Sequence, residues 1–239
     1  MSDPNLSVSP AAPVSGALRI SLRTAAILLL FTIAFTALMA QMYQLTRPII
    51  EATMLDAKRR LIAEVLPAAA YDNDLLADFI ELPPVAALGL PAPTRLYRAR
   101  RAGQPVAMVM EAAAPDGYSG HIGLILAVQA DGRLAAVRVT QHKETPGLGD
   151  YIDPKKDKNK AQPWITQFDG RHFGETPREK WRVKKDGGAF DQRAGATITA
   201  RAVTRATGRA LEWAQQHAAA IYALPSAATF KEEPEEKSP

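Results

Sequence analysis

The sequence predicts an α+β protein, in which an N-terminal transmembrane helix is followed by one domain with an antiparallel sheet and flanking helices. Three observations lead to this fold class: an apolar stretch without charges from Thr24 to Thr46, strand-like segments joined by turn residues between Leu96 and Gln141, and a helical repeat of apolar residues from Thr199 to Ala223. With 239 residues, 47% of them hydrophobic and 23% charged, the chain suits one ordinary domain with an appendage.

The composition excludes several classes of function. The chain has no cysteine, which excludes disulfides, thiolate-bound iron–sulfur clusters, attached c-type haem and thiol catalysis. The net charge is only +4, and no basic stripe with interleaved aromatic residues is present, so we expect no nucleic-acid partner. Because no two of the four histidines stand at metal-ligand spacing, we expect no metal site.

The N-terminal segment reads as a tail followed by a membrane anchor. Residues 1–18 are rich in Pro, Ser and Ala and are expected to be a disordered tail. Residues 19–47 are expected to be the transmembrane anchor, because Thr24 to Thr46 as a helix would span roughly 34 Å, about the thickness of the bilayer core. A cleaved signal peptide is the alternative, but the apolar region is long for one and no small-x-small site closes it.

The charges around the apolar stretch leave its orientation open. Basic residues occur on both sides, and the positive-inside rule therefore leaves the side of the large domain undecided. They are Arg19 and Arg23 before the stretch, and Arg47, Lys58, Arg59 and Arg60 after it.

Residues 48–93 are expected to form a helical stalk and a connector. Apolar residues at helical spacing run from Ile49 to Leu66, and Pro67 ends the pattern. Residues 67–93 are rich in Ala, Leu and Pro, and their pattern predicts neither a helix nor a strand.

Residues 94–224 are expected to form the main domain. Its sheet is predicted as two pairs of strands, the first around the turn at Gly103-Gln104 and the second around the turn Ala130–Arg133. The predicted strands are Leu96–Arg101, Val106–Ala113, Ile122–Gln129 and Leu134–Gln141.

The second half of the domain is predicted as a long loop with short elements, closed by the last helix. The loop covers Lys143–Gln162, and the helix covers Thr199–Ala223. Trp164–Phe168 is predicted as a short helix and Trp181–Lys184 as a short strand. Residues 225–239, which contain four glutamates, are expected to be a disordered acidic tail.

One candidate site is the segment Asp191–Thr199. Three small residues precede Thr197 at the point where the last helix is predicted to begin. A helix N-terminus offers unpaired backbone N–H groups and the positive end of the dipole, and small side chains allow a phosphate to approach them. The alternative is that Thr197 or Thr199 is only the N-cap of the helix.

A second candidate site is the segment Gln141–Asp150, directly after a predicted strand. Gly147 and Gly149 enclose Leu148, and such a turn presents backbone N–H groups together with one apolar side chain. The alternative is an ordinary surface loop.

Taken together, the two segments resemble the FMN-binding domain of the G subunit of Rnf-type ion-translocating oxidoreductase complexes, which the C subunit of sodium-translocating NADH:quinone reductase shares. The resemblance includes the run from His142 to Gly149, the run from Gly195 to Val203, the Gly117–Gly120 step and the N-terminal anchor. It covers most of the chain from residue 20 to about residue 222.

The resemblance implies that a separate flavin transferase attaches FMN covalently, through its phosphate, to Thr197. Gly195 and Ala196 then correspond to the two small residues that precede the acceptor threonine in the family's motif. Asp191 corresponds to the aspartate that precedes this motif. Ala194 departs from the pattern, because the family has Ser or Thr at that position. The remaining residues that the resemblance implies for cofactor binding are Thr199, Glu144, Thr145, Gly147, Leu148, Gly149, His142, Tyr118 and Lys184.

Two further roles are left open among several residues. Lys184, Lys185, Arg201 or Arg205 are candidates for balancing the phosphate charge. Tyr118 or Trp164 is a candidate for stacking on the flavin ring, although either can equally be a core residue.

The implied function is that of a membrane-anchored electron-transfer subunit, with no catalytic residue of its own. Its implied partners are the other subunits of an Rnf-type complex, the flavin transferase and the lipid bilayer. Its implied location is the bacterial inner membrane, with a single span and a periplasmic domain. The alternatives are a module that binds FMN non-covalently and a flavin-free assembly subunit. The coupling ion, sodium or proton, is not encoded in any feature of this chain.

Overall fold

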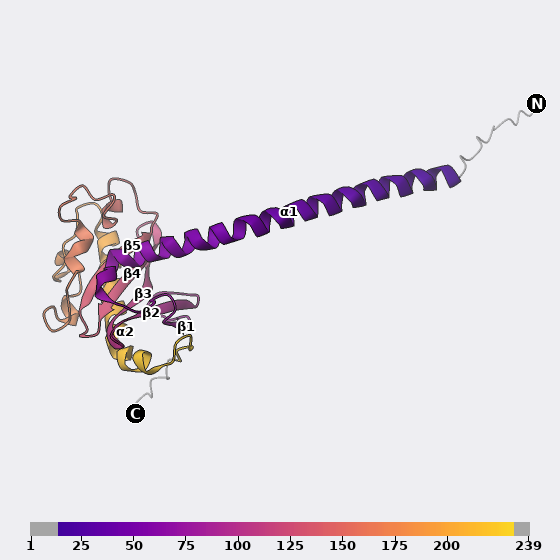
Figure 1. The fold of residues 1–239 in the computed structure, drawn as a ribbon. Helices are drawn as coiled ribbons and strands as arrows, with labels where there is room; N and C mark the ends of the chain where they lie inside the picture. The colour runs from indigo at the N-terminus through magenta and orange to yellow at the C-terminus, as the bar shows by residue number, and fades with distance from the viewer. Residues whose placement is uncertain (1–13, 232–239) are drawn as a thin grey trace, which may run out of the picture. The chain divides into compact units, whose positions relative to one another are not determined.

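The computed structural model describes residues 14–231, and the expectations for residues 1–13 and 232–239 lie outside this range. The described residues contain one long helix, five strands, several 3₁₀ turns and a second long helix (Figure 1). The chain divides into two compact units, Met1–Ala57 and Lys58–Pro239.

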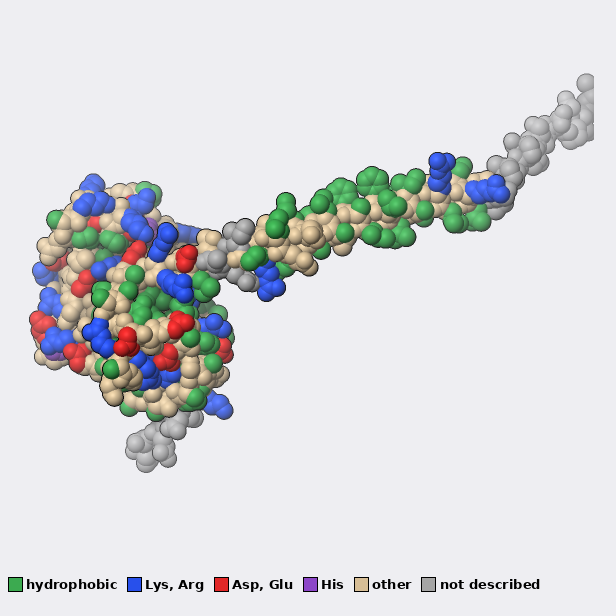
Figure 2. Space-filling model, in the orientation of Figure 1, with side chains coloured by type: hydrophobic (Ala, Val, Ile, Leu, Met, Phe, Trp, Pro, Cys, Tyr) green, Lys and Arg blue, Asp and Glu red, His purple; other side chains and the backbone are tan. Residues whose placement is uncertain are grey.

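The first unit contains most of helix α1, which runs from Val14 to Val65. An 18-residue window of this helix has a mean hydropathy of 2.1 and no buried residue, so the helix is long and apolar enough to cross a membrane. Figure 2 shows hydrophobic side chains along the helix. The hydroxyls of Thr24, Thr32 and Thr46 each donate to the carbonyl four residues earlier, so these polar groups are satisfied inside the helix. Since α1 begins at Val14, the expectation of a disordered tail is wrong for residues 14–18.

The second unit contains an antiparallel five-stranded sheet in the order β1-β2-β3-β4-β5. The strands are β1 (Phe79–Leu82), β2 (Thr94–Arg101), β3 (Gln104–Gly117), β4 (Gly120–Gln129) and β5 (Leu134–Gln141). All four predicted strands are therefore present, although β2, β3 and β4 begin earlier than predicted and β3 also ends later. Strand β1 lies within residues 67–93, for which the sequence predicted no secondary structure. Its four residues are too few to show a clear alternation of apolar and polar side chains.

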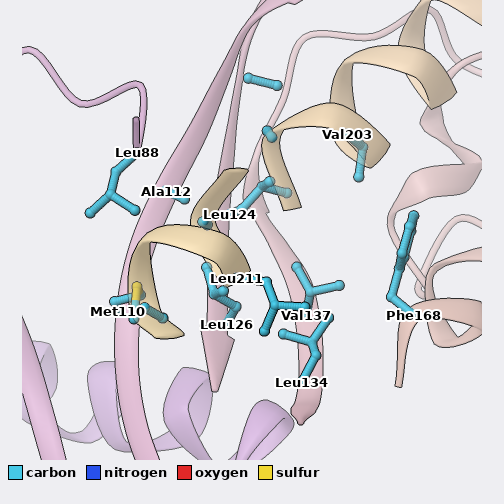
Figure 3. Packing of buried hydrophobic residues seen from close by; sticks show 14 of the residues in the cluster. Leu88, Met110, Ala112, Leu124, Leu126, Leu134, Val137, Phe168, Val203 and Leu211 are labelled. Carbon is cyan, nitrogen blue, oxygen red and sulfur yellow. The ribbon is translucent and has the colours of Figure 1, made fainter. Parts of the chain in front are cut away.

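Helix α2 (Thr197–Ala223) covers one face of this sheet, where the main core forms. Met110, Leu126 and Val137 are paired in register across β3, β4 and β5, and Leu211 of α2 packs over them (Figure 3). Alternate residues of each strand point to opposite faces, so a second cluster forms on the other side of the sheet. It comprises Ile62, Val65, Leu66, Leu75, Tyr97, Ala99, Ala107, Val109, Ile125, Ala127 and Ala136.

The region between β5 and α2 is held by aromatic side chains rather than by strands. Trp164–Phe168 is helical as predicted, in the 3₁₀ form, and Phe168 stacks on Phe190 at 4.7 Å between ring centroids. The predicted strand Trp181–Lys184 is wrong, because only Val183 forms a single bridge, with Phe190. The chain turns back at once through the left-handed Gly187 (φ 76°), which leaves no length for a strand.

The C-terminal segment is ordered further than expected. Thr229 pairs in parallel with Glu81 of β1, and Phe230 is buried against Trp213. The expectation of disorder from residue 225 is therefore wrong for residues 225–231. A single buried aromatic residue in a short segment of mostly small residues gives no periodic pattern that would have predicted this contact.

Candidate flavin site

Four separate segments meet around a cavity of about 440 Å³ in the second unit. Tyr118 comes from the β3–β4 turn, and Gly195–Thr199 come from the start of α2. The loop after β5 contributes Glu144, Thr145, Leu148 and Gly149, whereas Gly147 does not line the cavity. Lys185 completes the lining. The volume falls within the roughly 300–1,000 Å³ typical of small-molecule sites. Both segments that the sequence singled out therefore contribute to one cavity.

The start of α2 is open toward this cavity. Ala196 is the N-cap residue and provides no side-chain hydrogen bond, so the first N–H groups of the helix have no capping acceptor. Thr197 is the first helical residue, and its hydroxyl makes no hydrogen bond to any residue in the range 14–231. The alternative that Thr197 or Thr199 is the N-cap is therefore wrong. Gly195 has a φ of 85°, a conformation that glycine adopts without strain.

Thr199 binds a buried carboxylate instead of capping the helix. Its hydroxyl donates to Glu144 Oε2 at 2.5 Å, while the backbone N–H of Ser119 donates to Glu144 Oε1 at 2.9 Å. Glu144 is only 4% exposed. One side chain thus connects the β3–β4 turn, the loop after β5 and the first turn of α2.

The rim of the cavity is apolar and exposed. Tyr118, Leu148 and Ile198 are 66%, 54% and 47% exposed, respectively, and all three line the cavity. The backbone N–H groups of Leu148 and Gly149 both donate to the carbonyl of Thr145, at 3.1 and 3.0 Å, which closes the turn that presents Leu148. The loop after β5 thus forms part of a cavity wall, which an ordinary surface loop does not.

A group of residues that the sequence did not indicate shapes the segment before Thr197. The guanidinium of Arg193 lies 4.5 Å from the ring centroid of Tyr151 and pairs with Asp157 at 2.5 Å. The Tyr151 hydroxyl donates to the carbonyl of Ala196 at 3.4 Å. Arg193 lies inside the motif, but its partners are 42 and 36 residues away, which no local pattern reveals.

Burial affects the protonation of both partners of Arg193. Burial by itself would raise the pKa of the Asp157 carboxyl, but the N–H of Trp164 and the guanidinium of Arg193 outweigh it and lower this pKa. Burial raises the pKa of the Tyr151 hydroxyl above its ordinary value of 10.0. At neutral pH, Asp157 is therefore ionised and Tyr151 keeps its proton.

Some residues from the sequence prediction lie outside the cavity lining. Asp191 and Lys184 pair with each other at 2.6 Å on the surface. His142 accepts a hydrogen bond on Nδ1 from the N–H of Glu144 at 3.2 Å, which is a structural contact within the loop. Trp164 is buried and donates from Nε1 to the carbonyl of Asp191, so Tyr118 is the aromatic residue of the pair that lines the cavity.

The structure also distinguishes between the basic residues that are candidates for balancing the phosphate charge. Arg201 pairs with Asp186 at 2.6 Å, and Arg205 lies 3.4 Å from Asp116. Lys185, in contrast, lines the cavity beside the start of α2.

Comparison with known proteins identifies the family of this chain. The FMN-binding domain family matches residues 117–212, and the RnfG N-terminal region matches residues 17–65. The chain is 46% identical over 195 residues to the G subunit of the ion-translocating oxidoreductase complex of Pseudomonas aeruginosa (strain UCBPP-PA14), covering 82% of this chain and 89% of the relative. It is 43% identical over 199 residues to the G subunit of the same name from Yersinia pestis, covering 83% of this chain and 92% of the relative.

A solved structure with some similarity is the crystal structure of Shewanella oneidensis NqrC. It shares 22% sequence identity with a TM-score of 0.42, over 66% of this chain and 74% of that chain. The sequence matches, together with the apolar helix and the FMN-binding domain, show that this chain belongs to the family of G subunits of ion-translocating oxidoreductase complexes.

Proposed function

We propose that this protein carries electrons within an ion-translocating membrane complex through an FMN joined by its phosphate to Thr197. The observation that carries the proposal is the position of Thr197 as the first residue of α2, with its hydroxyl at the cavity and without a hydrogen-bond partner among the described residues. The names of the relatives support the complex, and the matched FMN-binding domain supports the cofactor.

The start of α2 suits a phosphate for three reasons. Its free N–H groups and the positive end of the helix dipole favour an anion. Gly195 and Ala196 add little bulk beside Thr197, so a phosphate can approach the backbone. Lys185 supplies a positive charge, which is needed because a phosphodiester keeps one negative charge after the ester forms.

The rim of the cavity suits the flavin ring. Tyr118, Leu148 and Ile198 expose apolar surface that a planar aromatic group would cover. When bound, FMN supplies the capacity to pass one or two electrons. The covalent bond keeps the carrier in place, and the protein determines its position and electrostatic surroundings. A flavin transferase attaches the group, and other subunits of the complex deliver and accept the electrons.

We further propose a domain arrangement in which residues 19–47 anchor the chain in the bacterial inner membrane as a single span. Residues 48–93 act as stalk and connector and contribute strand β1 to the sheet, and residues 94–224 form the rest of the FMN-binding domain, on the periplasmic side. Because the chain has no cysteine, one introduced cysteine reports the topology. Lys158→Cys, in an exposed loop, is expected to react with a membrane-impermeant maleimide in intact spheroplasts. Labelling only after lysis would place the domain in the cytoplasm.

The attachment is tested by the intact mass of the denatured full-length protein, co-expressed with the flavin transferase. We expect a gain equal to FMN less one water, which Thr197→Val abolishes. Thr204→Val is the matched control, since this buried threonine lies on the same helix, its hydroxyl has no hydrogen-bond partner among the described residues, and it does not line the cavity. Yellow protein without a mass gain would favour non-covalent binding, and colourless protein would favour the assembly subunit.

A further inference from the structure

The Glu144 carboxylate occupies an unusual position in the wall of the cavity. It is 4% exposed and accepts hydrogen bonds from two groups that are 25 and 55 residues away in the chain, the Ser119 N–H and the Thr199 hydroxyl. Each of its two oxygens accepts one of these bonds. The three connected segments also provide Tyr118, Leu148 and Thr197 to the cavity.

The hydrogen-bond partners of this side chain match those of a carboxylate. Both groups that contact the carboxylate act as donors, and a carboxylate is an acceptor on both oxygens. In the described range, no Lys or Arg side chain forms an ion pair with Glu144. The wall of the cavity therefore contains a fixed negative charge that hydrogen bonds stabilise and that no salt bridge neutralises.

Gly149 shows how tightly this arrangement is packed. A Cβ added at Gly149 would lie 2.7 Å from Glu144 Oε2, closer than real Cβ contacts, and 3.0 Å from Thr199 Oγ1, which is also tight. The loop therefore has no space for another side chain against the Glu144–Thr199 pair. The carboxylate is held in one position relative to the start of α2.

We propose that Glu144 is the positioning residue of the flavin site and that its charge lowers the midpoint potential of the bound flavin. The inference rests on the proposed function for the presence of FMN in this cavity. With FMN bound in this cavity, reduction would add electrons to a group whose site has the carboxylate in its wall. A nearby negative charge in a partly buried site disfavours that addition, so the potential falls.

Two substitutions distinguish the hydrogen bonds of Glu144, which hold the three segments together, from its negative charge. In Glu144→Gln the amide oxygen can still accept from Ser119, and the amide nitrogen can donate to the Thr199 hydroxyl, so the connection is kept while the charge is lost. In Glu144→Ala both the hydrogen-bonded connection and the negative charge are lost. Asp150→Asn is the matched control, because Asp150 lies in the same loop, accepts from the Gly147 N–H at 2.9 Å and does not line the cavity.

The test is a redox titration of the full-length flavin-loaded protein in detergent, with flavin content measured on the same samples. We expect Glu144→Gln to keep its flavin and to shift the midpoint potential to a more positive value. Glu144→Ala is expected to acquire little flavin during maturation, at an unchanged protein yield, because the free FMN is no longer positioned at Thr197. Asp150→Asn is expected to match the wild type in both measurements. An unchanged potential in flavin-loaded Glu144→Gln, or full flavin content in Glu144→Ala, overturns the proposal.

A failure of the proposed covalent attachment would be distinguished from a failure of this inference, because the wild-type protein would then show no mass gain. In that case the dissociation constant for added FMN replaces the flavin content. We expect Glu144→Ala to weaken binding at least tenfold and Asp150→Asn to leave it unchanged. Equal affinity of the wild type and Glu144→Ala would overturn the inference.

Discussion

Arg98 of β2 donates a hydrogen bond to the carbonyl oxygen of Leu224, at 2.5 Å, directly after the last residue of α2. The same guanidinium donates to the carbonyl of Ile221 at 2.9 Å and pairs with Asp78. The last carbonyls of a helix have no intrahelical donors and form the negative end of its dipole. A buried arginine on the sheet therefore holds the C-terminal end of the helix whose other end lies at the cavity.

Arg98→Met is expected to destabilise the second unit by about 3–5 kcal/mol, because the helix carbonyls lose their buried donor and Asp78 keeps only Arg100, 2.9 Å away, as its ion-pair partner. The control is Arg95→Met, on the same strand, whose side chain is 53% exposed and lies 3.6 Å from Glu81. We expect that change to cost no more than about 1 kcal/mol. Chemical denaturation of both variants compares them directly, and equal losses would contradict the capping role.

Asp157→Asn is expected to lower stability at neutral pH by roughly 1.5–3 kcal/mol, the usual contribution of hydrogen bonds to a charged group. Burial alone would raise the pKa of Asp157, but hydrogen bonds from Trp164 and Arg193 lower it below its ordinary value of 3.8. The stabilisation is therefore complete above this ordinary value and is lost as the pH falls through the lowered pKa of the folded state.

The measurement for Asp157 is the midpoint of thermal unfolding across a pH series that runs from neutral down to below the ordinary carboxyl pKa. The difference between wild type and Asp157→Asn should be constant at the upper end and shrink below about pH 4. Asp131→Asn is the control, because Asp131 is exposed and contacts Arg133 at the surface, through an ion pair at 3.5 Å and a hydrogen bond from the Arg133 backbone N–H at 3.0 Å. A difference that does not depend on pH would show that the charge of Asp157 does not contribute.

Gly149→Ala is expected to reduce flavin content strongly, whereas Gly147→Ala is expected to leave it close to that of the wild type. A Cβ at Gly149 meets the Glu144–Thr199 pair, but a Cβ at Gly147 meets nothing within 4 Å. Gly147 has a φ of 75°, so its substitution costs only backbone strain of about 1–2 kcal/mol. The ratio of flavin absorbance to protein is the measurement, and equal ratios in the two variants would argue against a tightly packed wall.

Ala194→Ser restores the hydroxyl that the family motif has at this position, and we expect it to leave the final extent of flavin attachment unchanged. Ala194 is exposed in the turn before α2 and does not line the cavity. Intact mass after co-expression with the transferase provides the measurement. A large gain of attachment in Ala194→Ser over wild type would show that the hydroxyl takes part in recognition by the transferase.

Local patterns in the sequence were sufficient wherever a single segment determines its own structure. Strand β5 has the predicted bounds, because its length and flanking turns are encoded in consecutive residues. Strand β1 could not be predicted in this way. It has four residues, and it forms because β2 offers an edge on one side and Thr229 pairs on the other.

The sequence by itself determined the apolar helix, the two strand pairs and the two segments whose residues identify the family. Only the tertiary structure decided which residues of those segments act together. It brought Lys185 rather than Lys184 to the cavity, and it joined Thr199 to Glu144 across 55 residues. The physical reason is that periodicity and turn chemistry are properties of neighbouring residues, whereas a buried hydrogen bond between distant segments depends on how the sheet and α2 pack.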